Sequence, residues 1–384
     1  HPSCLYKIGV TQRVNHPHRP RSVSVAAVAT THAHDAAACR DDDDSSAADT
    51  AGSVEESDAD VATDDTEAAD AASIDGERPA DWPTSITFGA VPAENASSLE
   101  ADFDTTVAIL KDELGLDEIE FFQASDYAGV IEGIIADRVD AAQFGGFSYV
   151  IATSNGADVS VAGVMTDGPD IEPGYRSYAL TQADNDDINT IDDFAGKNVC
   201  FVDPGSTSGF LFPSEGLLAA GIDPSETSTD LSPTFAGGHD ASAIAVANGD
   251  CDAGFAYDSM VTNQLIESGD IAGVVDAVED ENVNADAADL KIVWKSETIS
   301  GAPMAISNSL PASFVEAYQE VMTTKVNEDW AIANGYCSGT PDDNDCSFAD
   351  EEDTWGYVAK DDSFYDGIRQ VCEVTGASRC EPGG

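Results

Sequence analysis

Three consecutive hydroxyl side chains, Ser206, Thr207 and Ser208, form the richest chemistry-bearing segment of the sequence. They lie within residues 203–210 (DPGSTSGF), between a predicted strand and a predicted helix. Backbone N–H groups at a helix start carry partial positive charge, and neighbouring hydroxyls add hydrogen-bond donors. A simple helix N-cap needs only one hydroxyl. The pattern therefore favours a site for a tetrahedral oxyanion, with an ordinary cap turn as the alternative.

Three further side chains offer donors at comparable positions. His239 lies in a second Gly-rich turn before a predicted helix, where it has no core to fill. Tyr127 opens a predicted helix, and Tyr175 lies at an expected crossing between two lobes. Each tyrosine alone more often packs with its hydroxyl at the surface. Their combination with Ser206, Thr207 and Ser208, hereafter the hydroxyl turn, indicates one shared anion site.

Catalytic motifs are poorly matched. Residues 205–209 (GSTSG) resemble the G-x-S-x-G nucleophile elbow of hydrolases, but Thr207 takes the place of the serine. His239 and Asp240 are adjacent in a helix start and point apart, so they do not form the base and orienting acid of a triad. The sequence contains no HExxH, no Walker lysine and no GxGxxG. We predict a binding protein without metal or cofactor; the alternative is a secreted α/β hydrolase using Ser206 or Ser208 with His239.

Short apolar runs alternate with helical periods from residue 86 onward, which is typical of parallel βαβ units. The first set has strands at 86–89, 119–122 and 141–144 and helices at 99–114 and 127–136. The second set has strands at 197–203 and 253–257 and helices at 208–220, 240–247 and 259–268. We also expect one helix from 311 to about 333 and an irregular, Cys-rich end. The predicted fold class is α/β, with two lobes.

Composition divides the chain into four parts. Residues 1–39 form a leader with the order of a degraded lipoprotein signal ending at Cys39, the candidate lipid site. A non-structural leader is the alternative. Residues 40–83 have almost no large apolar side chains and are expected to be an acidic, disordered tether. We expect lobe 1 from 84–178 plus 297–384 and lobe 2 from 179–296, in a protein that works in the periplasm or on the outer face of the cell membrane.

The charge balance excludes several partners. Asp and Glu number 73 against 16 Lys and Arg, so the formal net charge is -57. Most of this charge falls on residues 84–384 rather than on the tether. Such a chain repels nucleic acid and anionic membrane faces. Because the sequence has no run of apolar residues long enough to span a bilayer, the only membrane contact we expect is a lipid on Cys39.

The cysteines support an exported location, because disulfides persist there. The chain has 8 cysteines. Cys200 and Cys251 each open a short apolar run, so they could bridge neighbouring strands. The last four, at 337, 346, 372 and 380, admit three pairings that the sequence does not distinguish. No CxxC pair is present and no His lies near the last four, so zinc is a poor interpretation.

Five segments occur in the order seen in PhnD-type proteins, the phosphonate and phosphite substrate-binding proteins of bacterial ABC transporters. They are residues 126–133, 144–149, 173–175, 203–210 and 238–248. The resemblance spans roughly residues 84–330. It implies a type II periplasmic-binding-protein fold, in which two α/β lobes joined by a hinge close on a ligand. It also implies delivery of that ligand to a membrane permease, and we expect a monomer.

The resemblance also implies a residue-by-residue site. Ser206, Thr207 and Ser208 match the cradle for the phosphorus oxyanion, and Tyr127, Tyr175 and His239 match its other donors.

Two departures from the family pattern concern specificity. Members that bind aminoethylphosphonate hold the amine with two carboxylates, whereas the matching positions here are Ser259 and Ala302. Asp258, one residue from the first, could substitute in part and completes the candidate ligand-binding residues. The incomplete amine cage implies phosphite or a small alkylphosphonate such as methylphosphonate, with another small anion such as a sulfonate as the alternative. Because a protonated phosphate oxygen needs an acceptor and a P–H or P–CH3 group does not, we expect phosphate to bind more weakly.

Overall fold

The computed structural model describes residues 78–94, 99–225, 227–279, 282–341, 343–348 and 354–383. The predicted leader (1–39), its lipid site Cys39 and all but the end of the predicted tether (40–83) lie outside the described residues. Within the described ranges, no helix is both long enough and apolar enough to cross a membrane.

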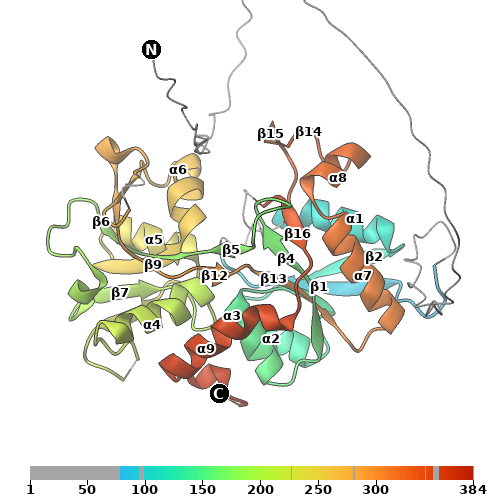
Figure 1. Cartoon of the computed structure of the whole chain (residues 1–384), viewed down its shortest axis with the longest axis horizontal. Helices are drawn as coiled ribbons and strands as arrows, with labels where there is room; N and C mark the ends of the chain where they lie inside the picture. Colours follow the sequence, from blue (N-terminus) through green and yellow to red (C-terminus); the bar gives the residue numbers. More distant parts are fainter. Residues whose placement is uncertain are drawn as a thin grey trace, which may run out of the picture. The chain divides into compact units, whose positions relative to one another are not determined.

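The first sheet has six strands in the order β16-β4-β13-β3-β1-β2 (Figure 1). The strands are β1 (Ser85–Ala90), β2 (Glu118–Phe122), β3 (Ala141–Gln143), β4 (Val159–Thr166), β13 (Pro303–Ser307) and β16 (Gly356–Val358). β1 pairs in parallel with β2 and β3, whereas β13 runs antiparallel to β3 and β4. Its helices are α1 (Asp104–Glu113), α2 (Tyr127–Ile135), α3 (Gly146–Ser154), α7 (Ala312–Thr324), α8 (Glu328–Asn334) and α9 (Asp366–Thr375).

The second sheet has six strands in the order β10-β11-β6-β9-β7-β8. The strands are β6 (Ser177–Gln182), β7 (Asn198–Phe201), β8 (Ser232–Phe235), β9 (Ala253–Tyr257), β10 (Val274–Asp276) and β11 (Leu290–Lys295). β7 pairs in parallel with both β8 and β9. The helical segments are η3 (Thr207–Leu211), a π-helical turn that continues into α4 (Phe212–Ala219), α5 (His239–Ala247), and η4 (Met260–Gln264), which continues into α6 (Leu265–Ser268).

The chain crosses between the sheets twice, and the two crossings pair with each other. β5 (Gly174–Tyr175) lies between β4 and β6, and β12 (Ile299–Ser300) lies between β11 and β13. The two short strands are antiparallel, with Tyr175 opposite Ile299. Tyr175 therefore lies at the junction of the two sheets, as expected.

Each sheet buries apolar side chains on both of its faces. In β1, Ile86 and Phe88 lie on one face, because alternate residues of a strand point to the same side. Both side chains are nearly fully buried. The Phe88 ring packs edge-on against Phe103, with centroids 5.1 Å apart. In the second sheet, Phe201 stacks on Phe255 at 5.3 Å. These cores hold the carboxyl ends of the parallel strands in fixed positions.

Two expectations about the C-terminal part were wrong. The predicted helix from 311 to 333 is two helices, because Asn327 has extended backbone and its side chain accepts a hydrogen bond from the Trp330 amide at the start of α8. The predicted irregular end contains β14 (Gly339–Thr340), β15 (Asp343–Asn344), β16 and the amphipathic helix α9. The apolar residues Ile368, Val371 and Cys372 have helical spacing and are buried, so this Cys-rich segment carries a helix signal.

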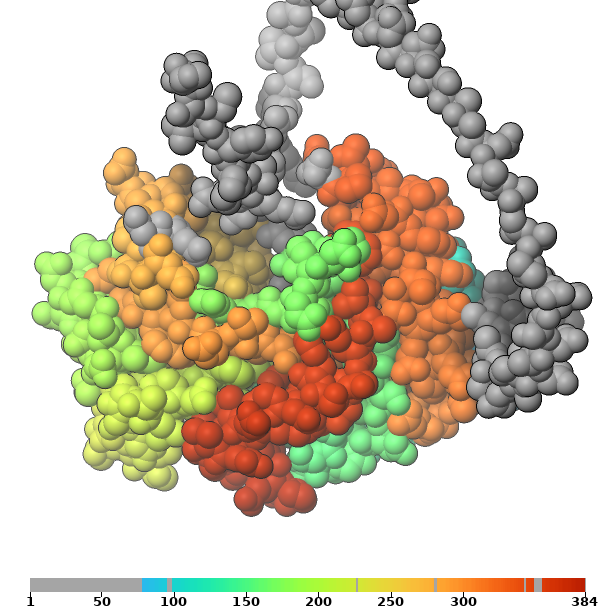
Figure 2. All heavy atoms as spheres, in the orientation of Figure 1, coloured from blue at the N-terminus to red at the C-terminus, as the bar shows by residue number. Residues whose placement is uncertain are grey.

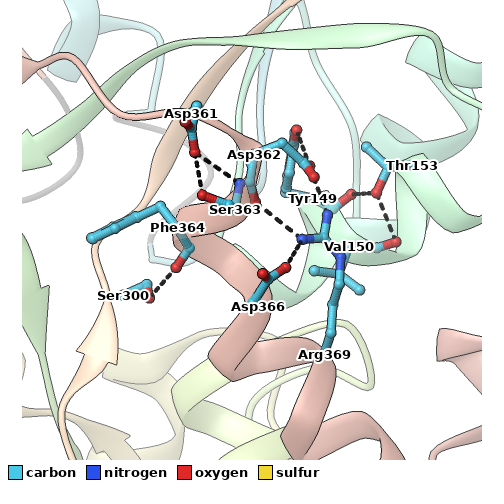
Figure 3. A network of polar contacts seen from close by, with 10 residues as sticks. All are labelled: Tyr149, Val150, Thr153, Ser300, Asp361, Asp362, Ser363, Phe364, Asp366 and Arg369. Carbon is cyan, nitrogen blue, oxygen red and sulfur yellow. Dashed lines mark hydrogen bonds and ion pairs between the residues drawn. The ribbon is translucent and has the colours of Figure 1, made fainter.

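Helix α9 packs against α3 of the first sheet and against α4 of the second. Figure 2 shows the C-terminal segment, in red, on the surface between the yellow-green residues of α4 and the green residues around α2. A polar network fixes it to α3 (Figure 3): the Tyr149 hydroxyl donates to the Asp362 carboxylate at 2.9 Å, and Arg369 donates to the same oxygen at 2.6 Å. Burial and the neighbouring Asp362 carboxylate raise the pKa of Tyr149. The network therefore holds α3, whose N-terminus faces the site described below.

Three disulfides are formed among the described residues. Cys200 of β7 pairs with Cys251, which precedes the neighbouring strand β9, as predicted. The last four cysteines pair as Cys337–Cys346 and Cys372–Cys380. Both of these bridges close short local loops.

Candidate functional site

A cavity at the carboxyl ends of the parallel strands brings six of the seven predicted residues together. We call it the anion cavity. It is lined by Val91, Ala93, Tyr127, Gln143, Phe144, Gly145, Tyr175, Ser206, Thr207, Ser208, His239, Tyr257 and Ala302. The turns after β7 and β8 meet here because parallel neighbouring strands end at the same edge of a sheet. No lysine or arginine is among these lining residues.

Ser206 is both the N-cap of the following helical segment and a cavity residue. Its Oγ accepts a hydrogen bond from the Gly209 amide at 3.0 Å and lies 3.3 Å from Nε2 of His239. A Cβ at position 209 would lie 2.3 Å from the Cβ of Val202, so only glycine fits there. The predicted cap and the predicted site thus coincide at this residue.

Thr207 links the second sheet to a helix of the first sheet across the cavity. Its Oγ1 accepts a hydrogen bond from the Phe147 amide at 2.9 Å, at the N-terminus of α3. A Cβ at Gly145 would lie only 3.0 Å from this oxygen, so glycine permits the close approach. The Thr207 hydroxyl proton can still be donated to a ligand.

The backbone of the hydroxyl turn has one anchored carbonyl and two amides at a helix start. The Ser208 carbonyl accepts a hydrogen bond from the Ser177 hydroxyl at 2.6 Å. The amides of Thr207 and Ser208 lie in the first turn of a helical segment, where amides have no intrahelical acceptor. Ser206, Thr207 and Ser208 are each no more than 2% exposed, so their donors act out of water.

Asp203 fixes the hydroxyl turn through hydrogen bonds and was not predicted as a site residue. Its carboxylate accepts a hydrogen bond from the Gly205 amide at 2.7 Å and another from the Tyr127 amide at the start of α2. Burial raises the pKa of this carboxyl, and the two amide donors oppose that effect. Asp203 therefore holds the hydroxyl turn and the Tyr127 helix start in register with each other.

His239 is a buried, uncharged donor or acceptor. It is 3% exposed, and burial lowers its pKa to about 3. Its backbone N–H donates to the Ala93 carbonyl at 2.8 Å, and its Nδ1 has no hydrogen-bond partner among the described residues. A hydrolase triad needs a carboxylate on that nitrogen. The Ser206–His239 pair therefore lacks the third member of a triad.

Tyr257 is a cavity residue that the sequence analysis missed. It ends β9, and its ring packs edge-on against His239 with centroids 4.7 Å apart. Its hydroxyl donates to the Glu94 carboxylate. Its place at the end of a strand beside β7 was a usable signal, because ligands bind at the carboxyl ends of parallel strands.

Asp258, the seventh predicted residue, lies outside the anion cavity. It lines a neighbouring space, the acidic cavity, with Met165, Asp167, Gly174, Tyr175, Ser259, Gly301 and Ala302. Its carboxylate accepts hydrogen bonds from the Arg176 and Ser259 amides at 3.0 and 3.2 Å. Burial raises its pKa to about 6, and these amides only partly oppose that effect. Tyr175 and Ala302 line both cavities.

Comparison with known proteins identifies the family. The family described as "ABC transporter, phosphonate, periplasmic substrate-binding protein" matches residues 88–334. The "Phosphate-import protein PhnD" of Mycolicibacterium smegmatis is 44% identical over 291 residues, which is 75% of this chain and 84% of that protein. The "Phosphonates-binding periplasmic protein" of Escherichia coli is 31% identical over 201 residues, 51% of this chain and 52% of that protein.

Solved structures support the fold. PhnD1 of Prochlorococcus marinus, solved in complex with methylphosphonate, matches with a TM-score of 0.61 at 18% identity and covers 77% of this chain and 99% of that chain. A binding component of an ABC phosphonate transporter from Pseudomonas aeruginosa matches with a TM-score of 0.59 at 21% identity, covering 76% and 86%. The predicted type II periplasmic-binding-protein fold is confirmed.

The expectation of a binding protein and not an enzyme is confirmed by the relatives, which are substrate-binding components of transporters. The chain belongs to the family of extracytoplasmic substrate-binding proteins of phosphonate ABC transporters.

Proposed function

We propose that this protein captures a small phosphorus oxyanion and delivers it to the permease of an ABC transporter. The observation that carries the proposal is the anion cavity, in which Tyr127, Tyr175, the hydroxyl turn and His239 surround one space. Neutral donors in a buried site bind an oxyanion strongly, because water does not compete for them. A chain of net charge -57 repels anions at long range, so capture rests on these short contacts.

The candidate ligands are phosphite, methylphosphonate and phosphate. Val91, Ala93, Phe144 and Ala302 give the cavity an apolar wall suited to a P–H or P–CH3 group. The Mycolicibacterium relative is named for phosphate import, and the Prochlorococcus protein was solved with methylphosphonate bound. We keep a sulfonate as the alternative ligand.

Asp258 is proposed to contact only a ligand that carries an aminoalkyl chain. A ligand confined to the anion cavity does not reach it, whereas an aminoalkyl chain extending past Tyr175 would enter the acidic cavity. There Asp258 and Asp167 could attract an ammonium group, as the partial substitute predicted from the sequence.

Four further expectations remain proposals. These are the division into lobes at 84–178 plus 297–384 and 179–296, the lipid on Cys39, the partner permease and the monomeric state. Mass spectrometry of the membrane fraction tests the lipid, and sedimentation of the purified chain tests the monomer.

Calorimetric titration of the full chain tests the proposed function. The ligands are phosphite, methylphosphonate, phosphate, aminoethylphosphonate and sulfate, in high salt to screen the net charge. We expect tight binding of at least one of the first three, and its loss in the triple variant Ser206→Ala, Thr207→Val, Ser208→Ala. The matched control removes three hydroxyls from an outer loop (Ser225→Ala, Thr227→Val, Ser228→Ala) and should bind as the wild type does. Binding of none of the phosphorus oxyanions would contradict the proposal.

A further inference from the structure

The direction of its hydrogen bonds distinguishes the Tyr257 hydroxyl from the other polar groups of the anion cavity. An ionised carboxylate only accepts hydrogen bonds, so in its contact with Glu94 the Tyr257 hydroxyl must be the donor. The Gln264 side-chain amide lies 3.1 Å from the Tyr257 oxygen and, with its NH2 turned toward the pair, donates to both Tyr257 and Glu94. The phenol proton is thus committed to Glu94.

Beyond the bond from Gln264, the remaining capacity of the Tyr257 oxygen is to accept one further hydrogen bond. This residue is 3% exposed, and its ring is held by the edge of His239. Glu94 directly follows Ala93, which lines the same cavity and accepts the His239 amide. Tyr257 thus brings an acceptor to the lining of a cavity whose hydroxyl turn presents donors.

A donor and an acceptor in one anion site recognise a partly protonated anion. A P–O⁻ group accepts from the hydroxyl turn, whereas a P–OH group donates and needs an acceptor. Phosphate and the phosphonates carry such a proton near neutral pH, and sulfate does not. A buried acceptor that faces an unprotonated oxyanion is repelled by it and loses its hydrogen bond.

We propose that Tyr257, held by Glu94, is a specificity-determining residue that accepts a hydrogen bond from the P–OH group of the ligand and thereby rejects sulfate. The inference rests on the proposed function and narrows its substrate class to phosphorus oxyanions that carry a proton. It also revises the expectation about phosphate. That expectation assumed a site without an acceptor, and Tyr257 supplies one, so phosphate belongs among the bound ligands.

The test compares the ratio of sulfate to phosphate dissociation constants in the full chain and its variants. Tyr257→Phe keeps the ring against His239 and removes the oxygen, so we expect phosphate affinity to fall about 10-fold while sulfate affinity stays level or rises. Glu94→Gln offers an amide in place of the carboxylate and allows Tyr257 to donate to the ligand. The ratio of the sulfate to the phosphate dissociation constant should therefore fall below the wild-type value in this variant too. Tyr175→Phe is the matched control, because Tyr175 lines the same cavity from β5 and loss of its hydroxyl should weaken both anions alike.

Two results would overturn the inference. One is a wild-type protein that binds sulfate as tightly as phosphate. The other is an unchanged ratio in both Tyr257→Phe and Glu94→Gln, with thermal unfolding showing that the variants are folded. Either result leaves phosphorus-anion binding intact, whereas failure of the wild type to bind any of the anions would overturn the proposed function itself.

Discussion

The anion cavity and the acidic cavity share Tyr175 and Ala302 yet have opposite chemistry. The first is surrounded by hydroxyls, amides and a neutral imidazole, and the second by the carboxyls of Asp167 and Asp258. Burial favours the uncharged form of one side chain in each cavity, since it lowers the pKa of His239 and raises the pKa of Asp258. The difference teaches that anion capture here depends on the direction of donors rather than on positive charge. Because the Asp167 and Asp258 carboxyls line the acidic cavity, we expect an anion to be bound in the anion cavity rather than there.

The largest effect should come from the Cys200–Cys251 disulfide, which links β7 to the start of β9 in the second sheet. Cys200 and Cys251 are 51 residues apart, so replacing both by Ala should lower the free energy of unfolding by about 4 kcal/mol on the chain-entropy model. Cys372→Ala with Cys380→Ala is the control, since that bridge spans only 8 residues and should cost about 2.5 kcal/mol. Urea unfolding measures both. Equal losses would show that loop length does not set the stability of this region.

Thr207→Val should separate donor geometry from cavity shape. The variant keeps the volume but removes the hydroxyl that accepts from Phe147 and is proposed to donate to the ligand. We expect phosphite or phosphate affinity to fall by about 30- to 100-fold, the effect of losing a hydrogen bond to a charged group. Thr207→Ser keeps the hydroxyl and should retain most of the affinity in the same titration. Equal losses in both variants would show that the methyl group matters as much as the hydroxyl, so that hydrogen bonding alone does not set the affinity.

His239 should make the anion cavity sensitive to acid. Its folded pKa of about 3 lies below the ordinary 6.5, so the unfolded chain takes up a proton first as the pH falls. The stability present above pH 6.5 is therefore lost toward pH 3, by about 2 kcal/mol between pH 6.5 and 5. His239→Gln should lose this part of the pH dependence, measured as the difference in Tm from the wild type. A difference that does not vary with pH would show that the pKa of His239 is the same in the folded and unfolded chains.

Asp258 should respond in the opposite direction and by a smaller amount. Its folded pKa of about 6 lies above the ordinary 3.8, so ionisation destabilises the fold as the pH rises from about 4 to 6. Asp258→Asn should remove this slope, although it also loses one amide hydrogen bond, which shifts Tm equally at every pH. Thermal unfolding at pH 4, 5, 6 and 7 measures it. Matching pH profiles for Asp258→Asn and the wild type would show that the acidic cavity is hydrated.

Much of the site was predictable because its signals are local. A helix start, three adjacent hydroxyls and a Gly-rich turn are each written in a few neighbouring residues, and the alternation of strands and helices brings such turns to one sheet edge. The Cys200–Cys251 bridge followed from the same reasoning, since each residue opens a short apolar run of the sequence. These features depend on chain geometry and hydrogen-bonding capacity within short segments. The sequence by itself therefore determined the fold class, the hydroxyl turn and three further cavity residues, Tyr127, Tyr175 and His239.

Only the tertiary structure decided which groups modify that site. Tyr257 and Glu94 are 163 residues apart, and the Tyr257 hydroxyl becomes a committed donor only when the two sheets bring them together. Asp258 was predicted among the ligand-binding residues, and only the structure shows that its carboxylate accepts from the Arg176 and Ser259 amides and lines the acidic cavity. Burial then sets the charge states of Asp258 and His239. Such properties arise from long-range contacts and the exclusion of water, and no short segment of sequence encodes either of them.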